Sequence, residues 1–423
     1  MSSFSHDLTS YPLMQKLNVK SIQWLSTGVE CDAVLNNFLQ AFFVSLDCEF
    51  ERQTTFFLKP ALLQISNTEQ VFLIDCAQGD AIHSTVLQHI LKNPAIQKVV
   101  HSGQEDIEML HQMGMSPHNL FDTQWADAYL REGGSRGLQK LVEEWLDLPL
   151  PKAETQSNWL QRPLSDEQLI YAAADAQVVA LLYPILREKL EKNQHWSYVY
   201  EDCQWILQPK TVNPKNYWLE ISDAWFLSHV QRARLYKLCE WRENKVRELN
   251  IPRRWLISDV HLYKMAEYNI TSFSQLKNIL SQVKNSVHHR FWPYAEECID
   301  VMNHSENSIN FLELPLPPLG RSTRKVQQQM ADVINVWANK LGLPRNILAS
   351  KRWLNGLLRN HLAMLLNQQT ESYLAFIGWR SEQILPDLLQ VLDQNSIELK
   401  DYLTSLQSYT ATGSLNTSLT ANE

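Results

Sequence analysis

Long apolar runs are missing from this 423-residue sequence, whose longest unbroken apolar stretches span only a few residues. A membrane-spanning helix needs about 20 consecutive apolar residues. The N-terminus, MSSFSHDLTS, lacks the basic start and the apolar segment of an export signal. With 44% apolar and 20% charged residues, the sequence predicts a cytoplasmic globular protein without membrane contact. Its length predicts two or three domains, and nothing in it indicates an obligate protein partner.

Cysteine pairs with the spacing of metal ligands are also missing. The six cysteines include no CxxC pair, which argues against structural zinc and against a disulfide framework. No GxGxxG, GxxxxGK[ST] or HExxH segment occurs, so the commonest phosphate-loop and zinc-protease sites are excluded.

An excess of positive charge is absent too, since the net charge is −8. The charge is uneven: residues 1–200 hold 14 Lys and Arg against 24 Asp and Glu, and the remainder holds 24 against 22. Two bound divalent cations would offset about four of the acidic charges, so the net charge understates the attraction of the first half for phosphate.

Strand-like segments gather in the first part of the chain. They are short, β-rich and separated by polar or proline-containing turns, at 21–27, 41–50, 61–66 and 71–76. From about residue 80 to 200 helical periodicity dominates, interrupted by a strand candidate at 97–102. This order predicts an α/β or α+β layered fold.

Beyond about residue 225 the pattern is entirely helical. A proline-rich break at 311–320 indicates a linker. Segments 252–262 and 344–354 match at Pro, Arg, Leu and Ser positions, each after a helix that carries a tryptophan. This match has two explanations of equal weight. The chain contains two related helical modules, or the helix starts are similar by chance.

Asp47 and Glu49 end an apolar strand-like run, FFVSLDCEF. Residues two apart on a strand point to the same face. Two carboxylates beside a core repel one another and need a cation or several hydrogen-bond donors.

Three further residues share this potential. Asp106 lies near a predicted helix N-terminus, where the helix dipole favours an acid. Tyr171 and Asp175 are four apart in LIYAAADAQVV, on one helix face. Each has an ordinary alternative when taken alone, as a helix-start acid or as a core aromatic with a local hydrogen bond. Oxygen ligands of this kind suit two Mg²⁺ or Mn²⁺ ions that activate water and stabilise a leaving oxygen at phosphorus.

The strings LDCEF, HSGQEDIEML with FDTQWADAYL, and RPLSDEQLIYAAADAQ resemble the three exonuclease motifs of the DEDD superfamily, in its tyrosine subgroup. The arrangement over residues 20–200 is similar to the bacterial ribonuclease D family. LYKLCEWRENKVRELNIPRRWLISD resembles its helicase-and-RNase-D C-terminal (HRDC) module, and a second module matches weakly. Cys48 departs from the threonine usual between the two acids of the first motif.

The resemblance implies a ribonuclease H-like exonuclease domain, with a mixed sheet flanked by helices, followed by two all-α HRDC-type domains. It implies that Asp47, Glu49, Asp106 and Asp175 hold two divalent metal ions and that Tyr171 positions the attacking water. The implied reaction is 3′-to-5′ removal of 5′-nucleotides from RNA, with tRNA precursors as substrates. A DNA repair or proofreading exonuclease, or a non-enzymatic RNA-binding adaptor, are the competing functions.

Substrate contacts are predicted at three further residues, each with an equal or stronger structural alternative: His101, Lys152 and Arg162. The basic stretch 232–254, with eight Lys and Arg against three Glu, suits either RNA contacts or a solvated helix face. The predicted organisation is an N-terminal extension, the exonuclease domain, a linker, HRDC domain 1, a second linker, HRDC-like domain 2 and a disordered tail: 1–19, 20–205, 206–222, 223–303, 304–321, 322–402 and 403–423.

Overall fold

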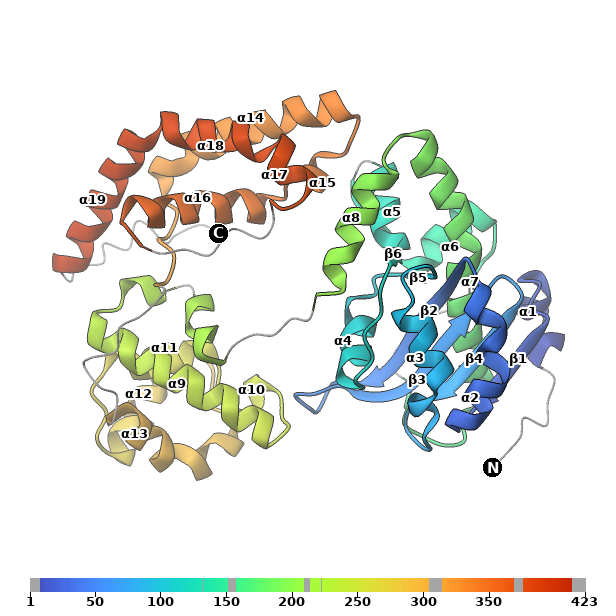
Figure 1. Cartoon of the computed structure of the whole chain (residues 1–423). Helices are drawn as coiled ribbons and strands as arrows, with labels where there is room; N and C mark the ends of the chain where they lie inside the picture. The colour runs from blue at the N-terminus through green and yellow to red at the C-terminus, as the bar shows by residue number, and fades with distance from the viewer. Residues whose placement is uncertain are drawn as a thin grey trace. The chain divides into compact units, whose positions relative to one another are not determined.

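The computed structural model describes residues 8–131, 133–150, 157–208, 214–221, 223–303, 314–368 and 376–412. These residues form two compact units. One lies within Met1–Gln53 and Leu58–Lys210, and the other lies within Thr54–Phe57 and Thr211–Glu423. Figure 1 shows that the first unit contains a sheet and that the second is helical.

A six-stranded mixed sheet forms the centre of the first unit, with the strand order β1-β4-β3-β2-β5-β6. β3 is antiparallel to both of its neighbours, and the other pairs are parallel. The five predicted strands are confirmed, whereas the three-residue β6 was missed. The strands are β1 (Ser21–Leu25), β2 (Phe43–Glu51), β3 (Lys59–Ser66), β4 (Gln70–Asp75), β5 (Gln97–Val100) and β6 (Leu120–Asp122).

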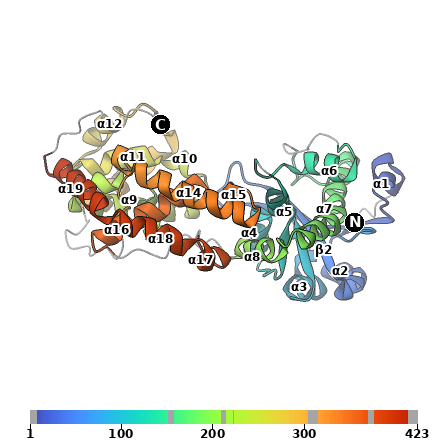
Figure 2. The ribbon, with the colours of Figure 1, turned by 90° about the horizontal axis from the view of Figure 1, so that it is seen from above.

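The two faces of the sheet carry different side chains. Val44, Leu46 and Cys48 of β2 enter an apolar core that α2 (Gly28–Leu35), α3 (Thr85–Lys92) and α4 (Gln104–Gln112) share. The opposite face of the sheet is covered by α7 (Asp166–Lys192), which packs on β2, β3 and β4 (Figures 1 and 2). The unit is completed by α1 (Pro12–Lys16), α5 (Thr123–Leu130), α6 (Leu138–Leu146) and α8 (Trp196–Ile206).

The 27-residue helix α7 is the central helix of this unit. It has the length and composition to cross a membrane, but 67% of its most apolar window is buried inside the fold. A helix that is apolar all round is expected in the core of a large domain. The fold therefore accounts for its hydropathy.

The second unit contains two successive sets of helices. The first set is α9 (His229–Glu248), α10 (Arg253–Leu256), α11 (Asp259–Glu267), α12 (Phe273–Leu280) and α13 (Ala295–Asn303). The second is α14 (Arg324–Leu341), α15 (Arg345–Leu348), α16 (Lys351–Leu365), α17 (Trp379–Gln383), α18 (Leu385–Gln394) and α19 (Ser396–Thr412).

The repeat suggested by the sequence has a structural counterpart. The short helices α10 and α15 each follow a proline at the N-cap position, Pro252 or Pro344. Each long preceding helix presents a tryptophan whose indole N–H donates to a carboxylate: Trp241 to Glu297 and Trp337 to Asp387. These shared details favour two related modules over a chance match.

Two local predictions need correction. The segment 403–423 was expected to be disordered, but α19 continues to Thr412, because Leu399, Leu403 and Leu406 recur at helical spacing and are buried. The rest of that segment, 413–423, lies outside the described residues. The helix α2 was missed within a region that reads as strands. Its signal was the capping box formed by Thr27 and Glu30.

Candidate active site

Asp47 and Glu49 lie on the face of β2 that α7 covers. Ser45, on the same face two residues earlier, donates a 2.7 Å hydrogen bond to the carbonyl oxygen of Ala176 in α7. A bulge between Glu49 and Phe50 interrupts the pairing of β2 with β3 just after the acidic pair. Bulges commonly re-aim side chains beside active sites. The predicted same-face arrangement of the two acids is confirmed.

Tyr171 and Asp175 project from α7 and are hydrogen-bonded to one another. A capping box formed by Ser165 and Gln168 starts this helix. The alanines at 172, 173, 174 and 176 are buried and let the helix lie close to the sheet. The ring of Trp159 packs 6.0 Å from that of Tyr171. The helix thereby brings both residues over the acidic end of β2.

Asp106 occupies the first turn of α4, as the sequence predicted. Gly103 at the N-cap lies so close to Val100 that an added Cβ would stand 2.4 Å from that side chain. Asp122 holds the same turn by accepting from the backbone N–H groups of Ser102 (3.0 Å) and Gly103 (2.9 Å). Sequence reasoning missed Gly103 and Asp122, although both lie in the motif strings HSGQED and FDTQ.

The acids act on one another through their charges. Burial, followed by the charges of Asp106, Asp175 and Glu49, raises the pKa of Asp47 well above its ordinary value. Burial also raises the pKa of Glu49 to about 9, with Asp175 and Asp106 adding to the effect. The pKa of Asp175 rises to about 6 through burial, against a lowering effect of the Tyr171 hydrogen bond. The side chains predicted to converge are therefore near neighbours.

Asp106 belongs to the same cluster, and burial raises its pKa to about 8, with Asp122 and Glu105 adding. Its hydrogen bonds with the thiol and backbone of Cys48 lower that pKa. Burial and the charge of Asp175 raise the pKa of Tyr171. The phenol therefore stays protonated at neutral pH. No carboxylate of the cluster forms an ion pair with Lys, Arg or His in the described part of the chain.

The donor set of the cluster fits divalent cations. Four carboxylates without a protein cation repel one another, and carboxylate oxygens are the ligands that Mg²⁺ and Mn²⁺ prefer. Among the described residues, no three His, Cys, Asp or Glu side chains already stand around one point as a closed metal site. The type and charge of these ligands therefore fit a divalent metal ion. Their side chains, however, are not drawn together around a common point in this structure.

The structure does not support the predicted substrate contacts as it supports the acidic cluster. Lys152 lies outside the described residues. His101 follows β5, and its Nδ1 is 2.9 Å from Thr123 Oγ1, while its buried Nε2 has no partner among the described residues. Burial lowers the pKa of His101, so the ring is neutral at pH 7. This arrangement favours the core role that was weighed against substrate binding.

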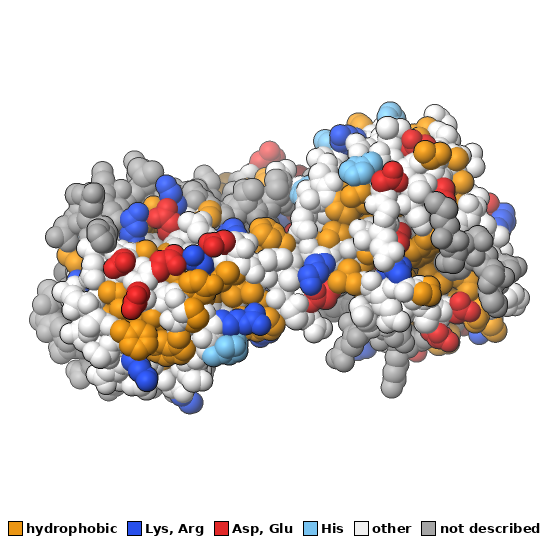
Figure 3. Space-filling model, turned by 90° about the horizontal axis from the view of Figure 1, so that it is seen from below, with side chains coloured by type: hydrophobic (Ala, Val, Ile, Leu, Met, Phe, Trp, Pro, Cys, Tyr) orange, Lys and Arg blue, Asp and Glu red, His pale blue; other side chains and the backbone are white. Residues whose placement is uncertain are grey.

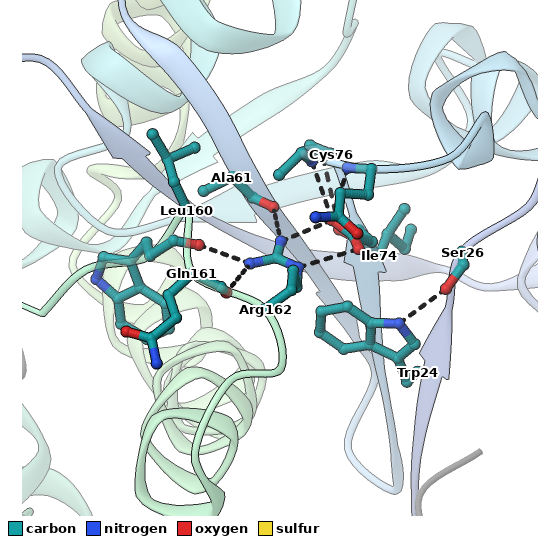
Figure 4. A network of polar contacts seen from close by, with 12 residues as sticks. Trp24, Ser26, Ala61, Ile74, Cys76, Leu160, Gln161 and Arg162 are labelled. Atoms are coloured by element: carbon teal, nitrogen blue, oxygen red, sulfur yellow. Dashed lines mark hydrogen bonds and ion pairs between the residues drawn. The ribbon is translucent and has the colours of Figure 1, made fainter. Parts of the chain in front are cut away.

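The guanidinium of Arg162 is engaged within the protein, which favours a structural role over the predicted substrate contact. Its guanidinium donates to both oxygens of Asp75, at 2.6 and 3.0 Å. It also donates to the carbonyls of Ala61, Trp159 and Gln161, and it lies over the ring of Trp24. All five N–H donors are thus used within the protein. Figure 4 shows this network, which fixes the segment before α7.

The basic stretch 232–254 is largely neutralised by its own unit. Five of its eight cations form ion pairs with acids of the second unit, namely Lys237, Arg242, Lys245, Arg247 and Arg253. Arg242 is only 1% exposed. Most of this positive charge is therefore structural.

The segment Gly133–Gly137 has the spacing GxSxG of a serine-hydrolase nucleophile turn. It lies between α5 and α6 rather than between a strand and a helix. The structural context that this nucleophile requires is therefore absent at Ser135.

Known proteins resemble both parts of the chain. The 3′-5′ exonuclease family matches residues 22–191, and the HRDC domain family matches residues 231–291. Ribonuclease D of Musicola paradisiaca is 30% identical over 347 residues, which are 80% of this chain and 89% of that protein. Ribonuclease D of Haemophilus influenzae is 30% identical over 345 residues, 80% of this chain and 84% of that protein.

A solved structure agrees with these relatives. The crystal structure of Escherichia coli RNase D, described as an exoribonuclease involved in structured RNA processing, matches with a TM-score of 0.78 at 25% identity. The match covers 88% of this chain and 99% of that chain.

The fold and the exonuclease match define the class of protein, a 3′-5′ exonuclease that hydrolyses phosphodiester bonds. The chain belongs to the ribonuclease D family and is an exoribonuclease. The predicted fold is confirmed as a mixed sheet flanked by helices and followed by a helical region with an HRDC domain. The domain boundaries and the kinship of the second helical module stay predictions.

Proposed function

We propose that the chain is a metal-dependent exoribonuclease that trims RNA 3′ ends with two divalent ions, Mg²⁺ or Mn²⁺. Asp47, Glu49, Asp106 and Asp175 would hold these ions. The ions would supply activation of water and stabilisation of the leaving oxygen. The observation that carries this proposal is the cluster of four mutually repelling carboxylates for which the described chain supplies no cation.

Tyr171 has a separate role in this proposal. Its phenol is protonated at neutral pH and hydrogen-bonded to Asp175, so Asp175 orients it. A protonated phenol donates and accepts hydrogen bonds and can fix the position of the attacking water. In-line attack at phosphorus depends on such positioning.

The substrate we propose is RNA with a 3′ extension, and tRNA precursors in the cytoplasm are its physiological form. The relative from E. coli is described as acting in structured RNA processing, which supports a structured substrate. The HRDC match at residues 231–291 supports a second RNA-binding unit.

A cation-and-aromatic platform in the helical unit supports RNA as the partner. His288 stacks on Trp255 with ring planes 8° apart, and Arg290 lies 4.6 Å from the centre of the same Trp255 ring. Arg254 and Arg290 are exposed and form no ion pair within the described ranges. Figure 3 shows apolar surface on this unit, with Lys, Arg and His side chains along one part of its border and Asp and Glu side chains along another. Base stacking and phosphate contacts both suit such a surface.

The proposal is tested by incubating the full chain with 5′-labelled RNA and DNA oligonucleotides of one sequence, in Mn²⁺, in Mg²⁺ and in chelator. We expect a ladder that shortens from the 3′ end of the RNA, release of 5′-nucleotides, and no reaction in chelator. Preferential shortening of the DNA would support the repair-type exonuclease instead. Binding without shortening would support the adaptor.

A further inference from the structure

Gln64 in β3 is a buried polar residue that the reaction described above does not use. It is 0% exposed, and neither its amide nitrogen nor its carbonyl oxygen has a hydrogen-bond partner among the described residues. Leaving a buried amide unsatisfied costs about 1–3 kcal/mol. Such groups in native proteins have a specific reason.

The sheet register places Gln64 beside the acidic cluster. Gln64 is the direct antiparallel partner of Asp47, so both side chains stand on the face that α7 covers. Opposed residues have Cβ atoms about 4.5–5.5 Å apart, a separation that an amide and a carboxylate can bridge. On its other side Gln64 pairs with Leu73 in β4, which has no polar side-chain atom.

Two other buried polar residues at the contact between β3 and α7, Ser66 and Gln177, do have hydrogen-bond partners. Ser66, the next residue of β3 on this face, donates to Gln177 Oε1 at 2.7 Å. The amide nitrogen of Gln177 donates to the carbonyl of Thr68 at 2.8 Å. Gln64 differs from Gln177 in two ways: its register partner is an acid of the cluster, and its side chain has no hydrogen bond to any residue that the structure describes.

We propose that Gln64 is a positioning residue for the exonuclease reaction: when the metal ions are bound, its amide N–H would donate to the carboxylate of Asp47 and orient the oxygens of that carboxylate for metal binding. This hydrogen bond is not made in the present arrangement. The inference rests on the proposed metal-binding role of Asp47. A carboxylate accepts stronger hydrogen bonds when it is ionised. Groups that orient metal ligands in this way change affinity or activity about 10–100-fold when they are lost.

The test is Gln64→Met, which keeps the unbranched shape and removes both polar atoms. We expect an unchanged or higher melting temperature in chelator, because an unsatisfied amide is gone. With RNA we expect kcat to fall at least tenfold with KM unchanged. Calorimetric titration of the RNA-free protein should show weaker Mn²⁺ binding by a similar factor. Gln64→Leu serves as a second variant if Gln64→Met does not fold.

Gln177→Met is the matched control, a buried glutamine whose bonds are structural. It should lower the melting temperature and leave kcat and Mn²⁺ affinity unchanged. The inference is overturned if Gln64→Met behaves in that way. Asp47→Asn separates the two proposals: an active Asp47→Asn enzyme contradicts the proposed function, whereas an inactive one beside a fully active Gln64→Met enzyme contradicts only the role of Gln64.

Discussion

Glu49 in the sheet unit and Glu243 in the helical unit are two glutamates with opposite surroundings. Glu243 is 0% exposed and accepts from Arg253 at 2.5 and 2.7 Å and from Arg247 at 2.9 Å. Burial raises its pKa, but the arginines outweigh burial and lower the pKa below its ordinary value. The charged neighbours of Glu49 within the described residues are acids, Asp175 and Asp106, and its pKa rises to about 9.

This difference separates structural acids from functional ones. A buried acid that serves the fold comes with its cation in the sequence, as Glu243 does with Arg253 and as Asp75 does with Arg162. A cluster of acids without one is costly to the fold. A cation bound from solution would neutralise these acids and offset that cost.

The largest expected effect is a loss of catalysis when an acid of the cluster is replaced. Asp47→Asn should lower kcat by about 10³-fold or more, because the amide removes a negative ligand from the metal cluster. Its melting temperature in chelator should equal or exceed that of the wild type, because the folded state no longer has to bury a carboxyl group whose pKa is raised. Retained activity within tenfold of wild type would contradict the assignment of Asp47.

Tyr171→Phe should have the next largest effect. It keeps the ring that packs against Trp159 and removes the hydroxyl, so kcat should fall about 10²-fold with little change in RNA affinity. Single-turnover rates and a binding titration with chelator present measure the two quantities. An unchanged rate would remove the water-positioning role.

Glu243→Gln tests whether the buried acid of the helical unit stabilises the fold through its arginines. Loss of the carboxylate leaves arginines without their acid, and the unfolding free energy of the helical unit should fall by about 3 kcal/mol. Calorimetric unfolding measures this loss. Activity on a short oligonucleotide at low temperature should persist. Glu240→Gln, which breaks a more exposed pair with Lys237, should cost less than about 1 kcal/mol.

The smallest effect is expected at the platform of the helical unit. Arg290→Glu should raise KM for a structured RNA a few-fold and leave kcat on a short oligonucleotide unchanged, because one phosphate contact is lost. Lys351→Glu makes the same charge change at an exposed residue of α16 and should do neither. Equal effects of the two substitutions would show that net charge, not the platform, is responsible.

Much of the fold could be predicted from the sequence, because strands and helices with a buried face show a regular pattern of apolar residues. Alternation in β2 and apolar runs in β3 and β4 predicted the central strands. β6 was too short to show a pattern, and α2 was masked by its position among strands. The C-terminal end of α19 is rich in Ser and Thr, which is typical of disorder, and its helical signal is the spacing of Leu399, Leu403 and Leu406.

The acidic residues of the candidate site could be predicted from the sequence, but the residues that support them could not. Carboxylate types and spacing pointed to Asp47, Glu49 and Asp175. The hydrogen-bond network of Arg162 could not be predicted, because a single arginine in a sequence does not reveal its partner Asp75, 87 residues away. Gln64 gave no signal at all, since only the register of β2 and β3 sets it opposite Asp47.

The central claim, that the acidic cluster requires a cation, is tested most directly by melting temperature with and without Mn²⁺ at pH 6 and pH 8.5. The pKa values of Glu49 and Asp106, about 9 and about 8, lie above those of the unfolded chain, about 4. The folded state therefore binds protons more tightly, and its stability in chelator should fall as the pH rises above about 4, until this loss levels off near pH 8 to 9.

Mn²⁺ should raise the melting temperature, and more at pH 8.5 than at pH 6, because protons compete with the metal. Substitution of both Asp47→Asn and Glu49→Gln should remove this gain. A wild-type melting temperature that does not respond to Mn²⁺ at pH 8.5, or an equal gain in the double variant, would contradict the account.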